Sequence, residues 1–268
     1  HTNIMATVYI KPGTGTGTGT LADPYFYSQL STAETAAGSG GTIYFTDGTY
    51  TASSFSFDEN GVNYKSLNPL GAILEGTSGS VRILTLGHYS ITTTAMSLEG
   101  FTLNNVRINT YQGGSSTAKN TIKSNKITAT LSSLNIVESQ NSTTTDFLYN
   151  SFIIDYDAGS SLSLSYIKGT MNGNSFYIDI DASVTSITSG FNGTNLVRKN
   201  NIWVSTDSSK IGVSLASNDS FSCFHNYGSS NTSGGTSNVF ADPQFVDAPS
   251  GDLRLRPSSP CIGAGTAS

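Results

Sequence analysis

The chain has 268 residues, a net charge of −5 and only 12% charged residues. Gly, Ser, Thr and Asn are abundant, which suits many short strands and turns better than helices. No basic stripe is present that would neutralise phosphates, so nucleic acid is not an expected partner. No apolar run approaches the ~20 residues of a membrane span, so we expect no membrane-spanning segment.

Residues 1–40 predict an N-terminal strand, a Gly/Thr loop and a capping helix. Val8–Ile10 reads as the strand, and GTGTGTGT at 13–20 is a flexible low-complexity loop. The following segment, DPYFYSQLSTAETAA, predicts a short amphipathic helix with Pro24 at its first position and Gly38 after its end. A solenoid needs its open end covered, and this helix is the expected cap.

Residues 41–240 predict the coils of a solenoid, because one strand pattern recurs along them. Each copy opens with Asn and has apolar residues at its third and fifth places, the alternation of a strand with one buried face. The copies start 21 to 26 residues apart, which is typical of coils stacked about 4.8 Å from each other. The copies are NNVRINTY from Asn104, NKITATLS from Asn125, NSFIIDYD from Asn150, NSFYIDID from Asn174 and NNIWVSTD from Asn200.

The Asn that opens each copy predicts a ladder of hydrogen-bonded side-chain amides running from coil to coil. We expect the same Asn to take the left-handed conformation of the bend, which this residue type tolerates. Further coil strands are expected at SLEGFTL from Ser97, SLSLSYIKG from Ser161 and GTNLV from Gly193.

The two ends of the chain carry motifs of a known superfamily. VYI followed by DPY and GGTIYFTDGTYT resembles the N-terminal cap of pectin-lyase-like right-handed β-helix proteins. ADPQFVDAPSGDLRLRPSSPCIGAGT resembles their C-terminal motif, although Cys261 and Gly263 replace its usual Ala and Asp. The resemblance implies an all-β, right-handed parallel β-helix with an N-terminal capping helix, forming a single domain over residues 1–268. It does not choose a function, because lyases, glycoside hydrolases, epimerases, phage tailspikes and adhesins share this fold.

Residues 241–268, which hold the C-terminal motif, are interpreted as structural. Asp242 and Asp252 are expected to accept hydrogen bonds from turn amides, and Arg256 is expected to face outward. Cys223 and Cys261 either pair or remain two buried thiols.

Aligning the five copies brings outward-facing residues into three columns. They face outward because their parity is opposite to that of the buried positions. We therefore expect five carboxylates and three aromatic rings on one exposed sheet. The columns are Arg107, Thr128, Ile153, Tyr177 and Trp203 at the fourth place, Asn109, Thr130, Asp155, Asp179 and Ser205 at the sixth, and Tyr111, Ser132, Asp157, Asp181 and Asp207 at the eighth.

Asp155, Asp157, Asp179 and Asp181 are the candidate catalytic residues. Asp155 and Asp179 are expected one coil apart, about 5 Å at the backbone, and Asp155 and Asp157 about 6.5–7 Å apart along one strand. Like charges this close raise one pKa, as an acid–base pair requires, and both glycosidase spacings are available. Two alternatives stay open, namely a calcium site built from the same four side chains and a merely solvated acidic surface.

The candidate substrate-binding residues are Tyr111, Tyr177, Trp203, Asp207 and Arg107. The three aromatic rings offer flat apolar faces with polar tips, which suit stacking on a sugar. Pectate-type lyases, which this fold resembles, combine calcium-holding carboxylates with an Arg or Lys base. The resemblance therefore makes Arg107, Lys126, Arg198 and Lys199 candidate bases. Without calcium, such an acidic face would repel an acidic polysaccharide. Alternatively, the aromatic rings are ordinary surface or a subunit contact.

Three functions stay open. The first is an extracellular or virion-associated, tailspike-like protein that recognises a polysaccharide or cell-surface glycan. The second is a polysaccharide lyase or glycoside hydrolase, and the third is a structural solenoid such as a homotrimeric shaft. Met5 resembles a native start without a secretory signal. Either a signal was removed, or the protein leaves its cell by another route, such as inside a virion. Neither His88 nor His225 has a His or Cys at metal spacing in the sequence, and both are interpreted as structural or surface residues.

Overall fold

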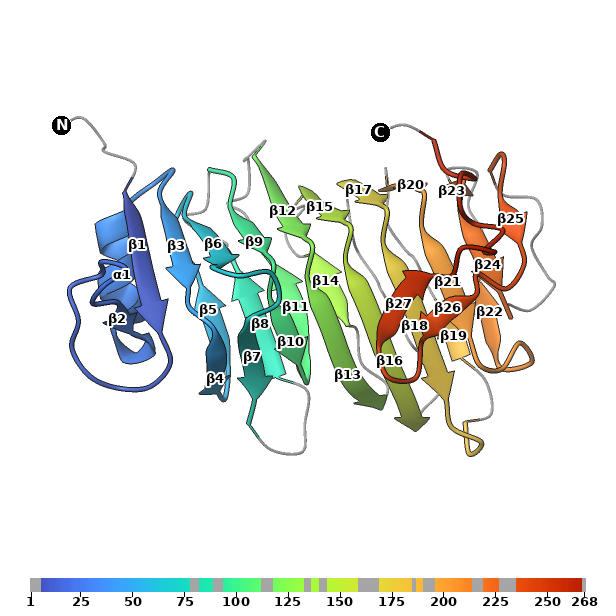
Figure 1. Cartoon of the computed structure of the whole chain (residues 1–268), viewed down its shortest axis with the longest axis horizontal. Helices are drawn as coiled ribbons and strands as arrows, with labels where there is room; N and C mark the ends of the chain where they lie inside the picture. Colours follow the sequence, from blue (N-terminus) through green and yellow to red (C-terminus); the bar gives the residue numbers. More distant parts are fainter. Residues whose placement is uncertain are drawn as a thin grey trace. The chain divides into compact units, whose positions relative to one another are not determined.

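Figure 1 shows the computed structural model, in which the described residues form short strands and, near the N-terminus, the helix α1. Its contacts divide the chain into two compact units, residues 1–126 with 139–145, and residues 127–138 with 146–268. The single domain expected over 1–268 stays a prediction. The structure describes residues 6–77, 82–88, 94–111, 118–132, 136–139, 144–158, 169–184, 187–189, 196–213, 219–226 and 235–266.

In the first unit the chain visits three parallel sheets in turn and returns to each one strand further along. This winding is that of a parallel β-solenoid. The first sheet has β2 (Tyr25–Phe26), β1 (Thr7–Lys11), β3 (Thr42–Phe45), β6 (Asn63–Ser66), β9 (Ser97–Glu99) and β12 (Lys119–Lys123); the second has β4 (Gly48–Ala52), β7 (Ala72–Gly76) and β10 (Thr102–Asn104); the third has β5 (Phe55–Phe57), β8 (Arg82–Leu86) and β11 (Val106–Thr110).

The second unit repeats the winding, so the predicted parallel β-helix is confirmed in both units. The expected strand at SLSLSYIKG falls largely in 159–168, outside the described residues. One sheet has β15 (Thr144–Leu148), β17 (Gly169–Asn172), β20 (Leu196–Lys199) and β23 (Asp219–Ser220), and the next has β13 (Lys126–Ser132), β16 (Ser151–Ala158), β18 (Ser175–Ile180), β21 (Ile202–Ser205), β24 (Cys223–His225) and β25 (Val239–Phe240).

The remaining strands of the second half of the chain are short. β14 (Val137–Ser139) precedes β15, and β19 (Ile187–Ser189) pairs in parallel with β22 (Ile211–Val213). β26 (Phe245–Asp247) forms an antiparallel hairpin with β27 (Asp252–Leu255).

The interior of the second unit is organised around a stack of aromatic rings. Phe152, Phe176 and Trp203 lie at the same position of successive coils, with ring centroids 4.4 and 3.7 Å apart. All three side chains are at most 1% exposed. Parallel, in-register strands place like positions above each other, so a repeated apolar residue becomes a continuous core column. Burial of each such side chain contributes about 1.5–3 kcal/mol.

A ladder of buried side-chain amides lines the turn that enters the β16–β18–β21 sheet. The Asn174 Oδ1 accepts the backbone N–H and the Nδ2 of Asn150 at 2.9 and 3.0 Å. The Asn174 Nδ2 donates to the Asn201 Oδ1 at 3.0 Å and to the carbonyl of Phe147 at 2.8 Å. Beyond Asn201, Ser222 continues the series. The predicted ladder is therefore confirmed in this unit.

The left-handed bend belongs to the residue before each ladder position, not to the ladder Asn itself as expected. Tyr149, Gly173 and Asn200 have φ of 57°, 70° and 55°. In the Asn200–Asn201 doublet the first Asn takes the bend and the second enters the ladder. The last copy of the repeat thus starts one residue later than predicted.

The first predicted copy, NNVRINTY from Asn104, lies at a different part of the coil. It forms β11, which pairs with β8 in the third sheet. The residue at the ladder position of that coil is Phe101, whose N–H donates to the Asn125 Oδ1 at 2.9 Å. The apolar alternation is real in both places, but the predicted alignment of this copy with the others is wrong.

The capping helix α1 (Leu30–Ala37) begins later than predicted, because the residues after Pro24 are used otherwise. Tyr25–Phe26 pair with β1 as β2, and a 3-10 turn η1 (Tyr27–Gln29) follows. Gly38, with φ of 62°, ends the helix as expected. The helix packs on β1 and β3 (Figure 1). Within the described part of the chain, no helix has the length and apolar character to span a membrane.

Glu34 of α1 is a buried carboxyl group, and its side-chain Oε1 accepts the Tyr64 hydroxyl at 2.7 Å. Burial raises the pKa of Glu34 to about 7, and the nearby carboxylates of Asp58 and Glu59 act in the same direction. The folded state therefore binds a proton that the unfolded state releases near pH 4.5. The contribution of Glu34 to the free energy of unfolding is therefore largest below pH 4.5 and is lost as the pH rises to about 7.

Replacing Glu34 by Gln is expected to raise the free energy of unfolding at pH 8 by about 2–3 kcal/mol and to flatten its decline between acidic and neutral pH. Gln keeps the acceptor for Tyr64 and carries no charge. Denaturant unfolding at a series of pH values measures this effect. Glu75→Gln, which removes a half-buried carboxylate of β7 elsewhere in the first unit, is the matched control. A pH dependence of Glu34→Gln equal to that of the wild type would contradict the assignment.

Candidate functional site

The outer face of the sheet β16–β18–β21 carries the aspartates predicted from the repeat. Asp155 and Asp179 are directly opposite each other on adjacent strands, and both side chains are exposed. Tyr177 lies two residues before Asp179 on the same face and is half-buried. Its pKa is raised by burial and by the Asp179 carboxylate. The structure thus brings three of the predicted site residues together.

Threonines flank the aspartate pair on both sides. The Thr206 hydroxyl donates to the Asp179 Oδ1 at 3.0 Å, and Thr130 hydrogen-bonds with Asp155. The pKa of Asp155 is raised, first by partial burial and then by the neighbouring negative charges, of which Asp179 is the strongest. The protonated form of Asp155 is therefore favoured more than in an isolated aspartate, and two facing carboxyl groups on adjacent strands are a geometry that acid–base pairs use.

Asp157 and Asp181 lie two residues further along the chain than this pair, and their negative charges also raise the pKa of Asp155. Asp157 is exposed near the end of β16. The Asp181 Oδ1 accepts the N–H of Ser183 at 2.7 Å, which lowers the pKa of Asp181. Lys210 donates to the carbonyl of Asp181 at 3.0 Å and closes this turn. Among the residues that the structure describes, no three His, Cys, Asp or Glu side chains converge as metal ligands.

Trp203 is not on the outer face, and the prediction that it stacks on a sugar is corrected. Its side chain is 1% exposed and belongs to the core stack. The cause is the one-residue shift after Asn200, which pairs Phe176 with Trp203 and Tyr177 with Val204. Ser205, predicted to face outward, is buried for the same reason.

The other predicted binding residues, Asp207, Arg107 and Tyr111, do not lie beside Asp155 and Asp179 on the outer face of the β16–β18–β21 sheet. Asp207 builds a turn, since its Oδ1 accepts the N–H and the hydroxyl of Ser209 at 2.9 and 2.6 Å. Arg107 lies on β11 and Tyr111 directly follows it, in the first unit rather than in the β16–β18–β21 sheet. The predicted columns that joined these residues to Asp155 and Asp179 are therefore wrong.

A hollow of about 720 Å³ lies on the outer face beside Tyr177. One wall consists of outward side chains from successive coils, namely Tyr177, Val204, Thr206 and His225. The opposite wall is the C-terminal segment, residues 242–249 with Arg256 and Ser258. Thr206 joins the hollow to the aspartate pair, because it lines the hollow and donates to Asp179.

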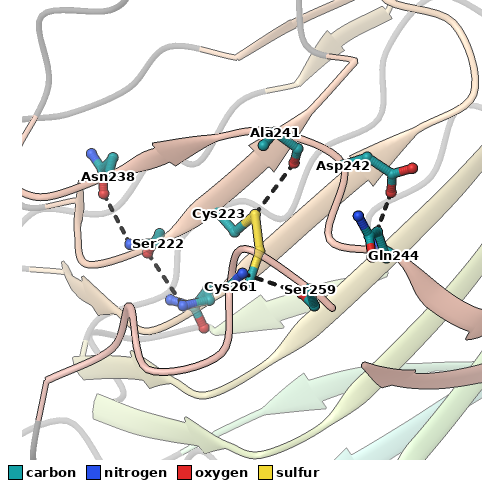
Figure 2. Close-up of a disulfide and its surroundings, with 9 residues drawn as sticks. Ser222, Cys223, Asn238, Ala241, Asp242, Gln244, Ser259 and Cys261 are labelled. Carbon is teal, nitrogen blue, oxygen red and sulfur yellow. Dashed lines mark hydrogen bonds between the residues drawn. A yellow bond between two sulfur atoms is a disulfide. The ribbon is translucent and has the colours of Figure 1, made fainter. Parts of the chain in front are cut away.

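The C-terminal wall is held in shape by its own hydrogen bonds. Arg256 donates from Nε to the carbonyl of Phe245 at 3.2 Å and from Nη2 to that of Val246 at 2.9 Å. The Ser258 hydroxyl donates to the Gln244 Oε1 at 2.6 Å. The Asp242 Oδ1 accepts the N–H of Gln244 at 2.8 Å, a turn contact that the sequence predicted (Figure 2).

A disulfide ties this wall to the coils. Cys223 of β24 and Cys261 of the C-terminal segment are paired, and the Cys261 N–H donates to the Ser259 hydroxyl (Figure 2). Cys223 and His225 lie on the same outward face of β24, because Cys223 pairs with Ile202 and His225 with Val204. The bond therefore anchors the C-terminal segment beside the outward residues of the hollow.

The sequence alone does not predict the hollow, because its two walls come from segments that the repeat pattern does not connect. The sequence analysis interprets His225 on one wall as a structural or surface residue and the C-terminal motif on the other wall as structural. The available signal was the cysteine pair, since a bond from the outward Cys223 to Cys261 requires the C-terminal segment to cross this face.

The winding through parallel sheets, together with the asparagine ladder, defines a parallel β-helix, which is the fold that the resemblance of the terminal motifs implied. No protein-family model and no curated protein matches the sequence. A solved structure of a rhamnogalacturonan lyase is similar, with 12% identity and a TM-score of 0.39 over 83% of this chain and 74% of that chain. A likeness this distant carries no argument about activity.

Proposed function

We propose that this protein recognises polysaccharide in the hollow beside Tyr177. The observation that carries the proposal is a hollow of about 720 Å³, a size typical of ligand sites, next to a half-exposed tyrosine ring. Hydroxyl, amide and carboxylate groups line it at Thr206, Asn226 and Asp247. A sugar ring presents an apolar face and many hydroxyl groups, so this combination of groups matches its chemistry.

The setting that we propose is extracellular or virion-associated, as for a tailspike-like protein that contacts a cell-surface glycan. The Cys223–Cys261 disulfide supports an oxidising environment, since such bonds are rare in the cytosol. A homotrimer belongs to the same proposal. Light scattering of the purified protein tests it, and a monomeric mass would remove the trimer from the proposal.

A second candidate function is glycoside hydrolysis or polysaccharide lysis at the aspartate pair. The observation that favours it is that Asp155 and Asp179 face each other on adjacent strands and that the pKa of Asp155 is raised, as for a carboxyl group able to donate a proton. Asp179→Asn is then expected to abolish product formation and to retain binding. Absence of products from the wild-type protein, over a panel of polysaccharides, would remove this candidate.

Replacing Tyr177 by Ala is expected to weaken oligosaccharide binding about tenfold, because the stacking surface is lost. Binding to a glycan array, followed by titration of the best oligosaccharide, measures the effect. Ile153→Ala is the matched control, since Ile153 faces outward in the same column one coil earlier and does not line the hollow. Binding to no glycan, or equal losses in the two variants, would overturn the proposed function.

A further inference from the structure

The charges around the hollow are predominantly negative. Asp242 and Asp247 line it, and Asp179 lies at its edge, bonded to the lining residue Thr206. Arg256 is the cation of the lining, and its Nε and Nη2 already donate to carbonyls of the C-terminal wall. A ligand in the hollow therefore meets a surplus of carboxylates.

This surplus distinguishes between classes of sugar. A uronate or sulfated sugar would bring a negative charge beside Asp179, Asp242 and Asp247, and like charges across an interface are unfavourable. A neutral sugar instead offers hydroxyl donors, and hydrogen bonds from hydroxyl groups to carboxylates are short and strong. The charged groups of the hollow thus act against anionic ligands and in favour of neutral ones.

We propose that the hollow binds a neutral sugar unit of a glycan and discriminates against uronates, with Asp179 and Asp247 as specificity-determining residues. This inference rests on the proposed function and adds the substrate class to it. At a separation of ~6 Å in a solvent-exposed site, each carboxylate weakens the binding of a singly charged anion about threefold at low ionic strength. Salt screens this effect, so the discrimination is expected to shrink at physiological ionic strength.

The test is calorimetric titration of the full chain with neutral probes and an anionic probe. The neutral probes are cello-, xylo-, manno- and maltohexaose, and the anionic probe is hexagalacturonate, each at low and at physiological ionic strength. Asp247→Asn and Asp179→Asn are expected to strengthen hexagalacturonate binding about threefold each at low ionic strength. Both variants are expected to weaken the binding of the best neutral probe, because a neutral amide oxygen replaces a charged acceptor. The control is Asp58→Asn, a change in the first unit that keeps an acceptor for Ser56.

The outcomes separate failure of the neutral-sugar inference from failure of the proposed polysaccharide recognition. A neutral probe that binds more tightly than hexagalacturonate, with a gap that narrows in both variants and in salt, supports the inference. Hexagalacturonate bound as tightly as the best neutral probe, or a gap unchanged in the two variants, overturns the inference and leaves the proposed function standing. Binding of none of these probes overturns both.

Discussion

Replacing Trp203 by Ala is expected to lower the free energy of unfolding by about 3–5 kcal/mol. Its ring is 1% exposed and stacks at 3.7 Å on Phe176, which in turn stacks on Phe152. Truncation therefore removes a large buried surface and leaves a cavity between coils that rigid neighbouring strands fill only in part. Equilibrium denaturation in urea measures the change.

Two further variants separate this core role from a general effect of aromatic loss. Trp203→Phe continues the stack of phenyl rings and is expected to cost less than half as much as Trp203→Ala. Tyr177→Ala removes an outward ring one coil earlier and is expected to cost about 1 kcal/mol or less. Trp203→Ala as mild as Tyr177→Ala would contradict the buried position of Trp203.

Replacing Asn174 by Ala is expected to lower the free energy of unfolding by roughly 3–5 kcal/mol. The side chain accepts two hydrogen bonds from Asn150 and donates one each to Asn201 and to the carbonyl of Phe147. The side chains of Asn150 and Asn201 are buried, and Asn174 itself is fully buried. Its loss leaves several polar groups without partners, each of which costs about 1–3 kcal/mol.

The control for Asn174 is Ser175→Ala at the next position of the chain. Ser175 is half-buried on the outer side of β18, so its replacement is expected to change stability by about 0.5 kcal/mol or less. Asn174→Asp keeps the acceptor and loses the donor, and it should fall between the two. A loss for Asn174→Ala no larger than that for Ser175→Ala would show that the ladder contributes little.

The coil architecture could be predicted from the sequence because its causes are local and repeated. Period-2 alternation at Phe152/Ile154 and Phe176/Ile178 fixes which face of each strand is buried. A parallel register then follows from stacking equal positions. For the same reason the neighbouring positions of Asp155 and Asp179 could be predicted from two aligned copies.

Where the prediction failed, the local pattern allowed two registers and a contact elsewhere decided between them. The doublet Asn200–Asn201 offers two Asn residues for one ladder position, and in a strand a shift of one residue exchanges the inner and outer faces. The structure selects Asn201, which places Trp203 on Phe176 in the core. An apolar ring at the core position, as in the two preceding coils, was the signal for this choice.

The hollow depends on contacts between distant segments, which no repeat pattern encodes. Its walls come from β18, β21 and β24 on one side and from residues 242–258 on the other. The Cys223–Cys261 bond connects these segments, but the spacing of two cysteines in a sequence does not by itself establish a bond. The site residues contributed by the C-terminal segment were therefore outside the reach of the repeat alignment.

A crystal structure of the protein soaked with the neutral oligosaccharide that binds best would locate the sugar site directly. We expect density for a sugar ring in the hollow, stacked against Tyr177 and hydrogen-bonded to carboxylates of Asp179 or Asp247. Sugar density on another face, with the hollow holding only solvent, would contradict this expectation.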